Sequence, residues 1–271
     1  MKQEAARDRS GLVTPLPDRG PTATRAGSRF HLDRYHPGER HALHTHPYSS
    51  LTLVLSGWVE ERVGSEIRRG TALSVVVKPA GVDHADLFGV DGARTLRVEL
   101  SAEEEALARS SGFWPGRWWW SHGGDVSRIM IRMVQAIARG HDLGPPLEDL
   151  LYEALGALRG ETESAPRSRP PNWIVRVREA LDEESTSIGS LAGRERVHPV
   201  VLARVFRRSY GTTPTEYRRR ARARRAAGLL TGTRRPLVDV ALEAGYSDQA
   251  HLTRDLKAVL GVTPVAVRNL S

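Results

Sequence analysis

The chain has 271 residues and no cysteine, and its 40 Lys and Arg exceed its 32 Asp and Glu, giving a formal net charge of +8. This length leaves room for two domains, and the missing cysteine excludes disulfides, thiolate metal sites and cysteine nucleophiles. Residues 159–271 hold 21 basic and 12 acidic residues, a net +9, whereas residues 1–158 hold 19 and 20, a net −1. This asymmetry predicts that only the C-terminal part meets a polyanion.

Residues 1–28 are rich in Arg, Asp, Pro, Gly and Thr and have no apolar period, so we expect a mobile leader there. The leader has no apolar segment of the kind found in a secretory signal. No apolar run in the chain approaches the roughly 20 residues that a membrane-spanning helix needs. We therefore expect a cytoplasmic protein with no membrane partner.

Strand-like segments follow between residues 29 and 100. They are apolar or alternate apolar with charged residues, and they cover residues 51–55, 58–63, 71–77 and 94–100. Turn residues separate them, including Ser56-Gly57 and Asp91-Gly92. Short strands at regular spacing predict a small β-barrel or jelly roll over residues 29–100.

Two segments of this region carry closely spaced histidines. The first reads Gly38-x5-His44-Thr45-His46, and the second ends at His84 after Pro79-Ala80-Gly81-Val82-Asp83. Residues two apart on a strand face the same side, so His44 and His46 could share one ligand. Three imidazoles would suit zinc, iron, nickel or copper. The alternative is that the histidines line a pocket or hydrogen-bond to each other without metal.

These segments resemble the two motifs of the cupin family, whose histidines converge inside a barrel. The resemblance implies an effector pocket or a divalent metal site at His44, His46 and His84. The carboxylate ligand usual in that family would fall near Ser50, where this chain has no Glu, so the sequence does not predict a full four-ligand site. We expect no required cofactor, with a divalent metal in the barrel as the alternative. We expect His31, His36 and His41 to be surface or turn residues.

Residues 101–158 have helical periodicity. Two stripes of apolar residues at spacings of three and four predict two packed helices: Val126, Ile129, Met130, Met133, Val134 and Ile137, then Leu147, Leu150, Leu151, Ala154, Leu155 and Leu158. These helices could pack on the barrel or form a dimer with a second copy. Arg117 and three adjacent tryptophans, 118–120, precede the first stripe. We expect some of these tryptophans to cover the barrel and others to contact a partner.

A linker rich in Pro, Ser and charge is expected over residues 159–171, and an all-helical domain over residues 172–271. Two segments of that domain, about 187–209 and 237–259, predict helix, turn and helix. Six identities recur at an offset of 50 residues, which indicates a structural repeat: Leu202/Leu252, Arg204/Arg254, Gly211/Gly261, Thr213/Thr263, Pro214/Pro264 and Arg218/Arg268. In the second segment Ser247 occupies the position expected of an N-cap.

Two helix-turn-helix segments joined by a long helix and ending in GYSDQAHLTRDLKAVLGVTP resemble the DNA-binding domain of AraC/XylS-type bacterial transcription regulators. The resemblance covers roughly residues 173–268. The first turn departs from it, because Glu195-Arg196 stands where small residues are usual. We therefore expect that turn to be built differently.

The second helix of each segment is the expected reader of the DNA major groove. Its outward-facing side chains are the candidate DNA-binding residues: Val200, Ala203, Arg204, Arg207, Arg208, Gln249, Ala250, Thr253, Arg254 and Lys257. Arg can pair with guanine and Gln with adenine, whereas a phosphate contact would position the protein without reading sequence. The arginines of the connecting helix are expected to form mostly a solvated face.

The sequence thus predicts an α+β multidomain protein: a cupin-like β-barrel with helices, followed by an all-α double helix-turn-helix domain. Its expected function is promoter-specific transcription regulation in response to a small-molecule effector, as a homodimer, with RNA polymerase as a further partner. A metal-dependent cupin enzyme with a basic appendage is the main alternative. A nucleoid-type DNA binder without an effector is another.

Overall fold

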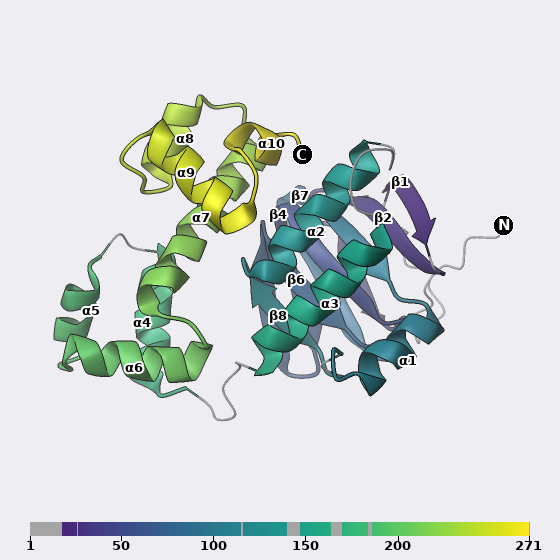
Figure 1. The fold of residues 1–271 in the computed structure, drawn as a ribbon, viewed down its shortest axis with the longest axis horizontal. Helices are drawn as coiled ribbons and strands as arrows, with labels where there is room; N and C mark the ends of the chain where they lie inside the picture. The colour runs from purple at the N-terminus through teal and green to yellow at the C-terminus, as the bar shows by residue number, and fades with distance from the viewer. Residues whose placement is uncertain are drawn as a thin grey trace.

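The computed structural model describes residues 18–25, 27–114, 116–139, 147–163, 170–183 and 186–270. A sheet with three helices is followed by an all-helical region, which confirms the α+β architecture (Figure 1). The strands are β1 Asp18–Arg25, β2 Ser28–Tyr35, β3 Arg40–His44, β4 Ser50–Val63, β5 Glu66–Thr71, β6 Ser74–Lys78, β7 His84–Glu99 and β8 Trp119–His122. Among all the described residues, no helix is both long and apolar enough to cross a bilayer.

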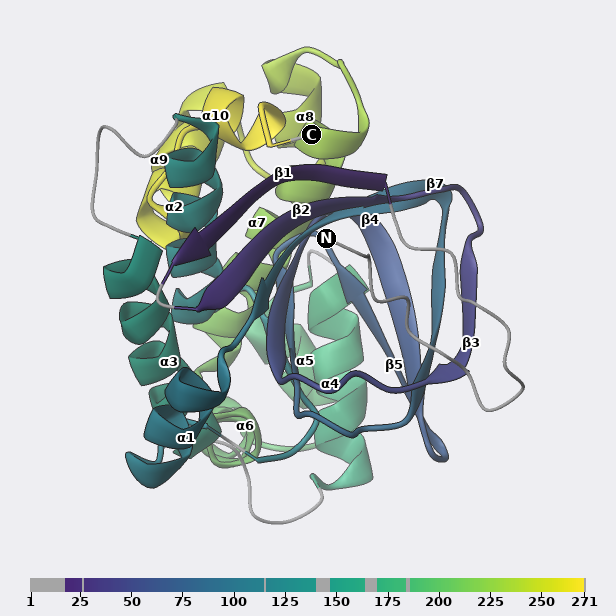
Figure 2. The ribbon, with the colours of Figure 1, turned by 90° about the vertical axis from the view of Figure 1, so that its right-hand side faces the viewer.

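The sheet is antiparallel and curls into a cupin-like barrel (Figure 2). Its strand order is β1-β2-β7-β4-β6-β8, with β3 paired to β7 and β5 paired to β4. The two long strands belong to both walls of the barrel. The early residues of β4 pair with β6 and its later ones with β5. In the same way β7 pairs first with β3 and then with β2.

Glycines bend both long strands where one wall passes into the other. Gly57 has φ +71° and Gly92 has φ +77°, and a Cβ on Gly57 would lie 2.0 Å from the Gly92 carbonyl oxygen. The strand register shifts on either side of Gly57. The turns expected at Ser56-Gly57 and Asp91-Gly92 are therefore wrong, because the chain kinks there and continues in the same strand.

Strand pairing also corrects two of the expected boundaries. β1 pairs with β2 from Asp18 to Arg25, so these residues are not a mobile leader. Residues 1–17 of the expected leader lie outside the described residues. β8 pairs with β6 and adds a strand to a region that was expected to be helical throughout. Local composition carried no sign of either strand. β1 pairs with the strand that follows it directly, starting at Arg25 and Ser28, whereas β8 is completed by β6, which lies far earlier in the chain.

In the part of the chain that the structure describes, three helices accompany the barrel: α1 Ala102–Ser110, α2 Asp125–Ala138 and α3 Leu147–Glu163. Every residue of the two expected apolar stripes on α2 and α3 is buried. They share a core with one face of the sheet, including Phe30, Leu53 and Leu96. The stripes are therefore filled within one chain. α3 also continues to Glu163, past the expected start of the linker, and residues 164–169 lie outside the described residues.

The three adjacent tryptophans are divided by the alternation of β8. Trp120 is buried against the barrel with Val54 and Val76, and Trp118 packs on the same cluster. Trp119 packs on the other core, shared with the helices. The barrel and its helices therefore account for all three indoles without a partner protein.

The described residues of the C-terminal region form seven helices: α4 Asn172–Glu183, α5 Ile188–Arg194, α6 Pro199–Tyr210, α7 Pro214–Gly232, α8 Leu237–Glu243, α9 Gln249–Leu260 and α10 Pro264–Arg268. α7 runs from the unit that contains α5 and α6 to the unit that contains α8 and α9 (Figure 1). The first unit packs around its own core, which includes Ile174, Leu202 and Phe206. The second unit shares the core of the barrel helices.

Candidate nucleic-acid interface and histidine cluster

In each helix-turn-helix unit a side chain caps the N-terminus of the second helix. His198 caps α6 by accepting the Val200 amide on Nδ1 at 3.3 Å. Asp248 caps α9 by accepting the His251 amide at 2.7 Å, so the expected cap at Ser247 is wrong by one residue. A carboxylate at the cap offsets the unpaired amides and the positive end of the helix.

The two turns differ in length, as the unusual first turn led us to expect. Four residues, 195–198, separate α5 from α6, whereas five residues, 244–248, separate α8 from α9. The left-handed position of the second turn is Gly245, at φ +86°. In the first turn the left-handed residue is Arg196, at φ +54°. A side chain is disfavoured in this conformation, so the first turn is strained relative to the second.

The candidate DNA-binding side chains lie on the outer sides of α6 and α9. Leucines fill the inner sides, and Leu202, Leu252 and Leu256 are completely buried. Eight of the ten candidates are exposed and two are half-buried: the exposed ones are Val200, Arg204, Arg207, Arg208, Gln249, Ala250, Arg254 and Lys257, and the others are Ala203 and Thr253. The Thr253 hydroxyl donates to the Gln249 carbonyl at 2.8 Å, so it is engaged within its own helix.

The basic side chains on these faces have few partners within the protein. Among the described residues, the side chains of Arg204, Arg207 and Lys257 make no hydrogen bond and no ion pair. Cations held on an open helix face without an internal partner are suited to phosphates and base edges. An internal salt bridge was one possible role for Arg204, and the described residues contain no such salt bridge.

The arginines of α7 behave differently from the expected solvated face. Arg219 pairs with the buried Asp255 of α9. Arg218 donates to the Thr186 carbonyl at 3.2 Å, and Arg225 donates to the Asp182 carbonyl at 2.6 Å. These side chains hold the two units onto the connecting helix, so their charge is used mainly inside the domain.

Inside the barrel, His44, His46 and His84 come together from β3, the following loop and β7. Their possible ligand atoms all lie within 4.8 Å of one another. The ring centroids of His44 and His84 are 4.2 Å apart, and His46 lies 4.9 Å and 5.2 Å from them. Burial lowers the pKa of His46 to about 2 and that of His84 to about 3. The imidazoles are therefore neutral at physiological pH.

The tautomers of two of these rings follow from their backbone contacts. His44 Nδ1 lies 2.8 Å from the Ala42 carbonyl oxygen, and His84 Nδ1 lies 2.9 Å from the Val82 carbonyl oxygen. A carbonyl only accepts, so each Nδ1 carries the proton and each Nε2 keeps its lone pair. In the described structure His84 Nε2 is buried without a hydrogen-bond partner. This arrangement is typical of metal-ligating histidines.

Other charged groups surround the cluster. Asp86 of β7 lies with its Oδ2 3.6 Å from His41 Nδ1, and His41 also contacts Glu39 at 2.8 Å. Burial opposes the charged form of His41, but these two carboxylates raise its pKa overall. Lys78 and Glu61 pair nearby at 2.9 Å. The expectation that His41 is a surface residue is wrong, because it is 8% exposed and faces this cluster.

A second buried polar group lies further along the barrel wall. His31, only 2% exposed, contacts Glu99 at 3.4 Å, and Arg97 pairs with Asp33 at 3.1 Å. His31 is therefore not a surface residue either. His36 does lie on an exposed stretch between β2 and β3. The sequence does contain a sign of this buried group. Residues 94–100 alternate in character, so Arg97 and Glu99 share one face of the strand, opposite to the face of Leu96.

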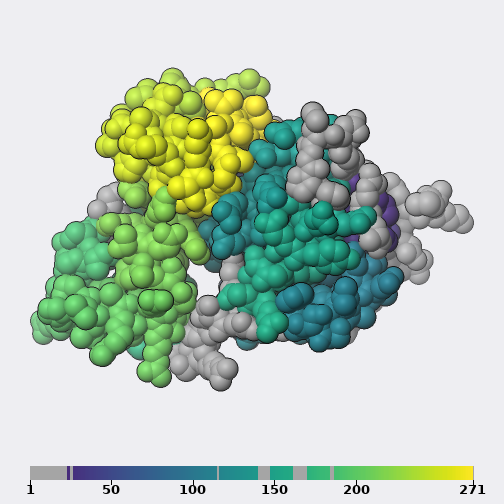
Figure 3. Space-filling view, in the orientation of Figure 1, coloured from purple at the N-terminus to yellow at the C-terminus, as the bar shows by residue number. Residues whose placement is uncertain are grey.

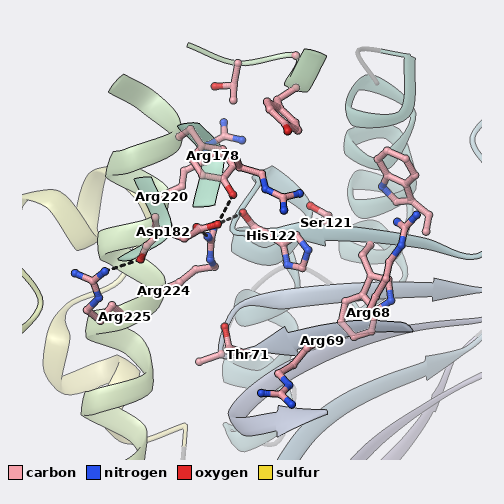
Figure 4. A pocket seen from close by; sticks show the side chains of 18 of the residues that line it. Arg68, Arg69, Thr71, Ser121, His122, Arg178, Asp182, Arg220, Arg224 and Arg225 are labelled. Atoms are coloured by element: carbon pink, nitrogen blue, oxygen red, sulfur yellow. Dashed lines mark hydrogen bonds and ion pairs between the residues drawn. The ribbon is translucent and has the colours of Figure 1, made fainter. Parts of the chain in front are cut away.

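An interdomain cleft of about 1660 Å³ separates the barrel from the first helix-turn-helix unit, and it was not foreseen (Figure 3). Arginines from both sides line it: Arg68, Arg69 and Arg117 from the barrel side, and Arg178, Arg220, Arg224 and Arg225 from the helical side. Arg224 crosses it by donating to the His122 carbonyl at 2.9 Å and to Asp182 at 2.7 Å (Figure 4). Tyr217 also donates to Asp182, at 2.9 Å.

Comparisons with known proteins agree with this geometry. A family model described as a helix-turn-helix domain matches residues 191–270. The arabinose operon regulatory proteins of Salmonella typhimurium and Escherichia coli are each 26% identical to this chain over 122 residues. That match covers 45% of this chain and 43% and 42% of those two proteins, so the chain spans less than half the length of these curated relatives.

Two solved structures are similar over different shares of the chain. ToxT from Vibrio cholerae aligns over 89% of this chain and 98% of its own, at 10% identity and a TM-score of 0.37. A cupin-2 domain containing protein from Shewanella frigidimarina aligns over 31% of this chain and 80% of its own, at 16% identity and a TM-score of 0.28. The match of the family model and the geometry of α5, α6, α8 and α9 identify residues 191–270 as a helix-turn-helix domain, which follows the barrel.

Proposed function

We propose that this chain is a cytoplasmic transcription regulator that binds promoter DNA through α6 and α9 and a small-molecule effector through its barrel. The observation that carries the proposal is the pair of reader helices, whose exposed basic and amide side chains make no hydrogen bond or ion pair with other described residues. Arg204 and Gln249 are the side chains best suited to base edges, guanine for Arg and adenine for Gln. Arg207, Arg208 and Lys257 are suited to phosphates.

The length of α7 supports simultaneous reading by both helices. Its 19 residues give a helix of roughly 28 Å at 1.5 Å per residue. Successive major grooves on one face of B-DNA are roughly 34 Å apart. The two readers would therefore enter neighbouring turns of one duplex, and Val200, Ala203, Ala250, Thr253 and Arg254 would complete the contact surfaces.

A gel-shift titration of the full chain against fragments of its neighbouring promoter tests the proposal. The expected result is a shift at nanomolar to micromolar protein that weakens steeply with salt and is lost with a scrambled fragment. Arg204→Ala and Gln249→Ala should weaken the shift. Arg132→Ala removes the same charge from α2, where Arg132 pairs with Glu153 at 2.7 Å, and should not weaken it. Equal affinity for every fragment would instead support a nucleoid-type binder.

We also propose that a divalent metal ion forms part of the effector site, held by His44, His46 and His84. The residues fit such an ion because both assigned Nε2 atoms are free of protons and His84 Nε2 is buried without a partner among the described residues. Bound metal would supply a Lewis-acidic centre to which an effector's oxygen or nitrogen atoms could coordinate. Elemental analysis of the protein from its native host checks this.

The same cluster supports the rival proposal of a metal-dependent cupin enzyme, an oxygenase or isomerase. Stoichiometric iron or nickel together with turnover would favour that rival. We propose a sensor rather than an enzyme because the helix-turn-helix domain provides an output for ligand binding. Regulation would then need no reaction in the barrel.

Two further partners belong to this proposal. A second copy of the chain would double the number of reader helices on an operator. Because the α2 and α3 stripes are used internally, the exposed Leu107 and Tyr152 on α1 and α3 are better candidates for such a contact. Sedimentation at increasing concentration tests for a dimer. RNA polymerase is the other partner, and reconstituted transcription with and without the regulator tests for that contact.

A further inference from the structure

We infer that Asp86 is a metal ligand and supplies, from β7, the carboxylate that the chain lacks near Ser50. The inference rests on the metal part of the proposed function and extends it from three histidines to a site of three nitrogens and one oxygen. It does not depend on whether the chain binds DNA.

The position of the carboxylate is the first argument. Asp86 follows His84 by two residues on one strand, so both side chains point to the same side of the sheet. Asp86 Oδ2 lies 3.8 Å from His84 Nε2 and 3.9 Å from His44 Nε2. Both of these nitrogens have been assigned a lone pair rather than a proton. Three lone-pair-bearing atoms therefore face one another without a proton between them.

The second argument is that some of these atoms lack a hydrogen-bond donor. Within the described residues, neither His84 Nε2 nor Asp86 Oδ1 has a hydrogen-bond partner, although the Asp86 side chain is only 8% exposed. Burying acceptors without donors costs free energy, and a cation that coordinates them removes that cost. A nitrogen and carboxylate donor set suits borderline divalent ions such as zinc, iron, nickel or cobalt.

The surroundings of Asp86 provide the third argument. His41 contacts it through Nδ1 at 3.6 Å while Glu39 holds the other ring nitrogen at 2.8 Å. An imidazole that is itself fixed by a second carboxylate keeps the Asp86 carboxylate oriented, as outer groups do around metal ligands. Glu61 lies directly opposite Asp86 in the β4–β7 pairing and its side chain is only 4% exposed, but it is occupied by Lys78 and by the Trp118 indole at 2.7 Å. Glu61 is therefore the matched carboxylate that should not bind metal.

Cobalt titration of the metal-free full chain tests the inference, with visible absorption reporting the ligands and competition against a chromophoric chelator reporting affinity. The unchanged chain should bind one Co²⁺. Asp86→Asn should weaken the affinity by at least about tenfold and shift the visible bands, because an amide replaces a carboxylate in the coordination sphere. Glu61→Gln should leave the bands unchanged and the affinity within a factor of about three. His84→Ala should remove the bands.

A role limited to positioning His41 would leave the Co²⁺ bands of Asp86→Asn where they are, and that result would overturn the inference. Absence of bands in the unchanged chain would overturn it too, together with the metal part of the proposed function. DNA binding by the same preparations then shows whether the regulator proposal survives. Circular dichroism of each variant without metal reports folding, and if Asp86→Asn does not fold, Asp86→Glu should still bind Co²⁺, with shifted bands.

Discussion

Single side chains on the two reader helices determine what kind of DNA contact each can make. Arg204 projects from the middle of α6, where a guanidinium can reach a base edge, whereas Lys257 lies in the last turn of α9. Arg204→Ala should cost about 1–3 kcal/mol on the preferred site and relax the preference at one base pair. Lys257→Ala should weaken all sequences about equally and reduce the salt dependence by about one charge.

Fluorescence anisotropy with a set of single-base operator variants at several salt concentrations measures both effects. The decisive quantity is the ratio of the Kd values for the best and the altered site. If Arg204→Ala leaves that ratio unchanged and weakens every site equally, Arg204 is a phosphate contact and its assignment to a base edge is wrong.

The strained first turn allows a prediction about stability. Arg196 is left-handed, and removing its Cβ relieves a cost of about 1 kcal/mol. Arg196→Gly should therefore raise the free energy of unfolding relative to Arg196→Ala by about that amount. The exposed Ala258 of α9 provides the control, since Ala258→Gly in a helix should lower stability by about 1 kcal/mol. Urea denaturation followed by circular dichroism compares the three variants with the unchanged chain. Equal stability of Arg196→Gly and Arg196→Ala would contradict the strain.

The sequence was informative about side chains whose role depends on neighbours in the chain, and less so where it depends on distant ones. The outward faces of α6 and α9 follow from helical spacing, so their exposure could be predicted. His31 and His41 look like surface residues locally, and only the curvature of the sheet turns them inward. Because Asp86 is two residues after His84 on one strand, the two side chains could be predicted to face the same side of the sheet. The distance from Asp86 to His44, however, depends on the pairing of β3 with β7.

Among the elements, the kinked strands β4 and β7 carry the curvature of the barrel. Gly57→Ala would place a Cβ 2.0 Å from the Gly92 carbonyl oxygen at a φ of +71°. The backbone must move to accept it, so we expect a loss of at least about 2 kcal/mol in the free energy of unfolding. Thermal and urea unfolding of the full chain measure the loss.

A matched glycine on α3 should respond in the opposite direction. Gly156 is helical and exposed, and nothing lies within 4 Å of an added Cβ. Gly156→Ala should raise the free energy of unfolding by about 0.4–1 kcal/mol, mainly by restricting the unfolded chain. If Gly57→Ala is as stable as Gly156→Ala, the two strands do not depend on a glycine at the kink.

These elements also show why strand ends were harder to predict than helices. The stripes on α2 and α3 repeat over several turns, and each repetition supports the same interpretation. A glycine between two apolar runs gives one local signal, which suits a hairpin turn and a kinked strand equally. Only the pairing of β4 with β7 from Ser50 to Arg62, on both sides of Gly57, shows that β4 is a single strand.

At the scale of the whole molecule, the two reading units are held in different ways. α9 is continuous with the apolar core of the barrel helices, because Leu252 and Leu256 share a cluster with Met130. α6 belongs to a separate core around Phe206. The first unit is linked to the barrel side through the polar bridge of Arg224 to the His122 carbonyl and Asp182. The second reader is therefore built into the sensor, while the first depends on polar contacts across a cleft.

Hydrogen exchange of the full chain should reveal this difference. Amides of α9 should open only with the barrel helices, whereas amides of α4 and α6 should exchange faster through opening of the smaller core. Arg224→Met keeps the aliphatic stem and removes the bridge, so it should speed exchange in α4 and α6 and leave α9 unchanged. Arg128→Met, near Gly261 on the α9 side, is the matched control and should not affect α6. Uniform exchange in both readers, or a change in α9 alone on Arg224→Met, would show that the polar bridge does not link the first reader to the barrel.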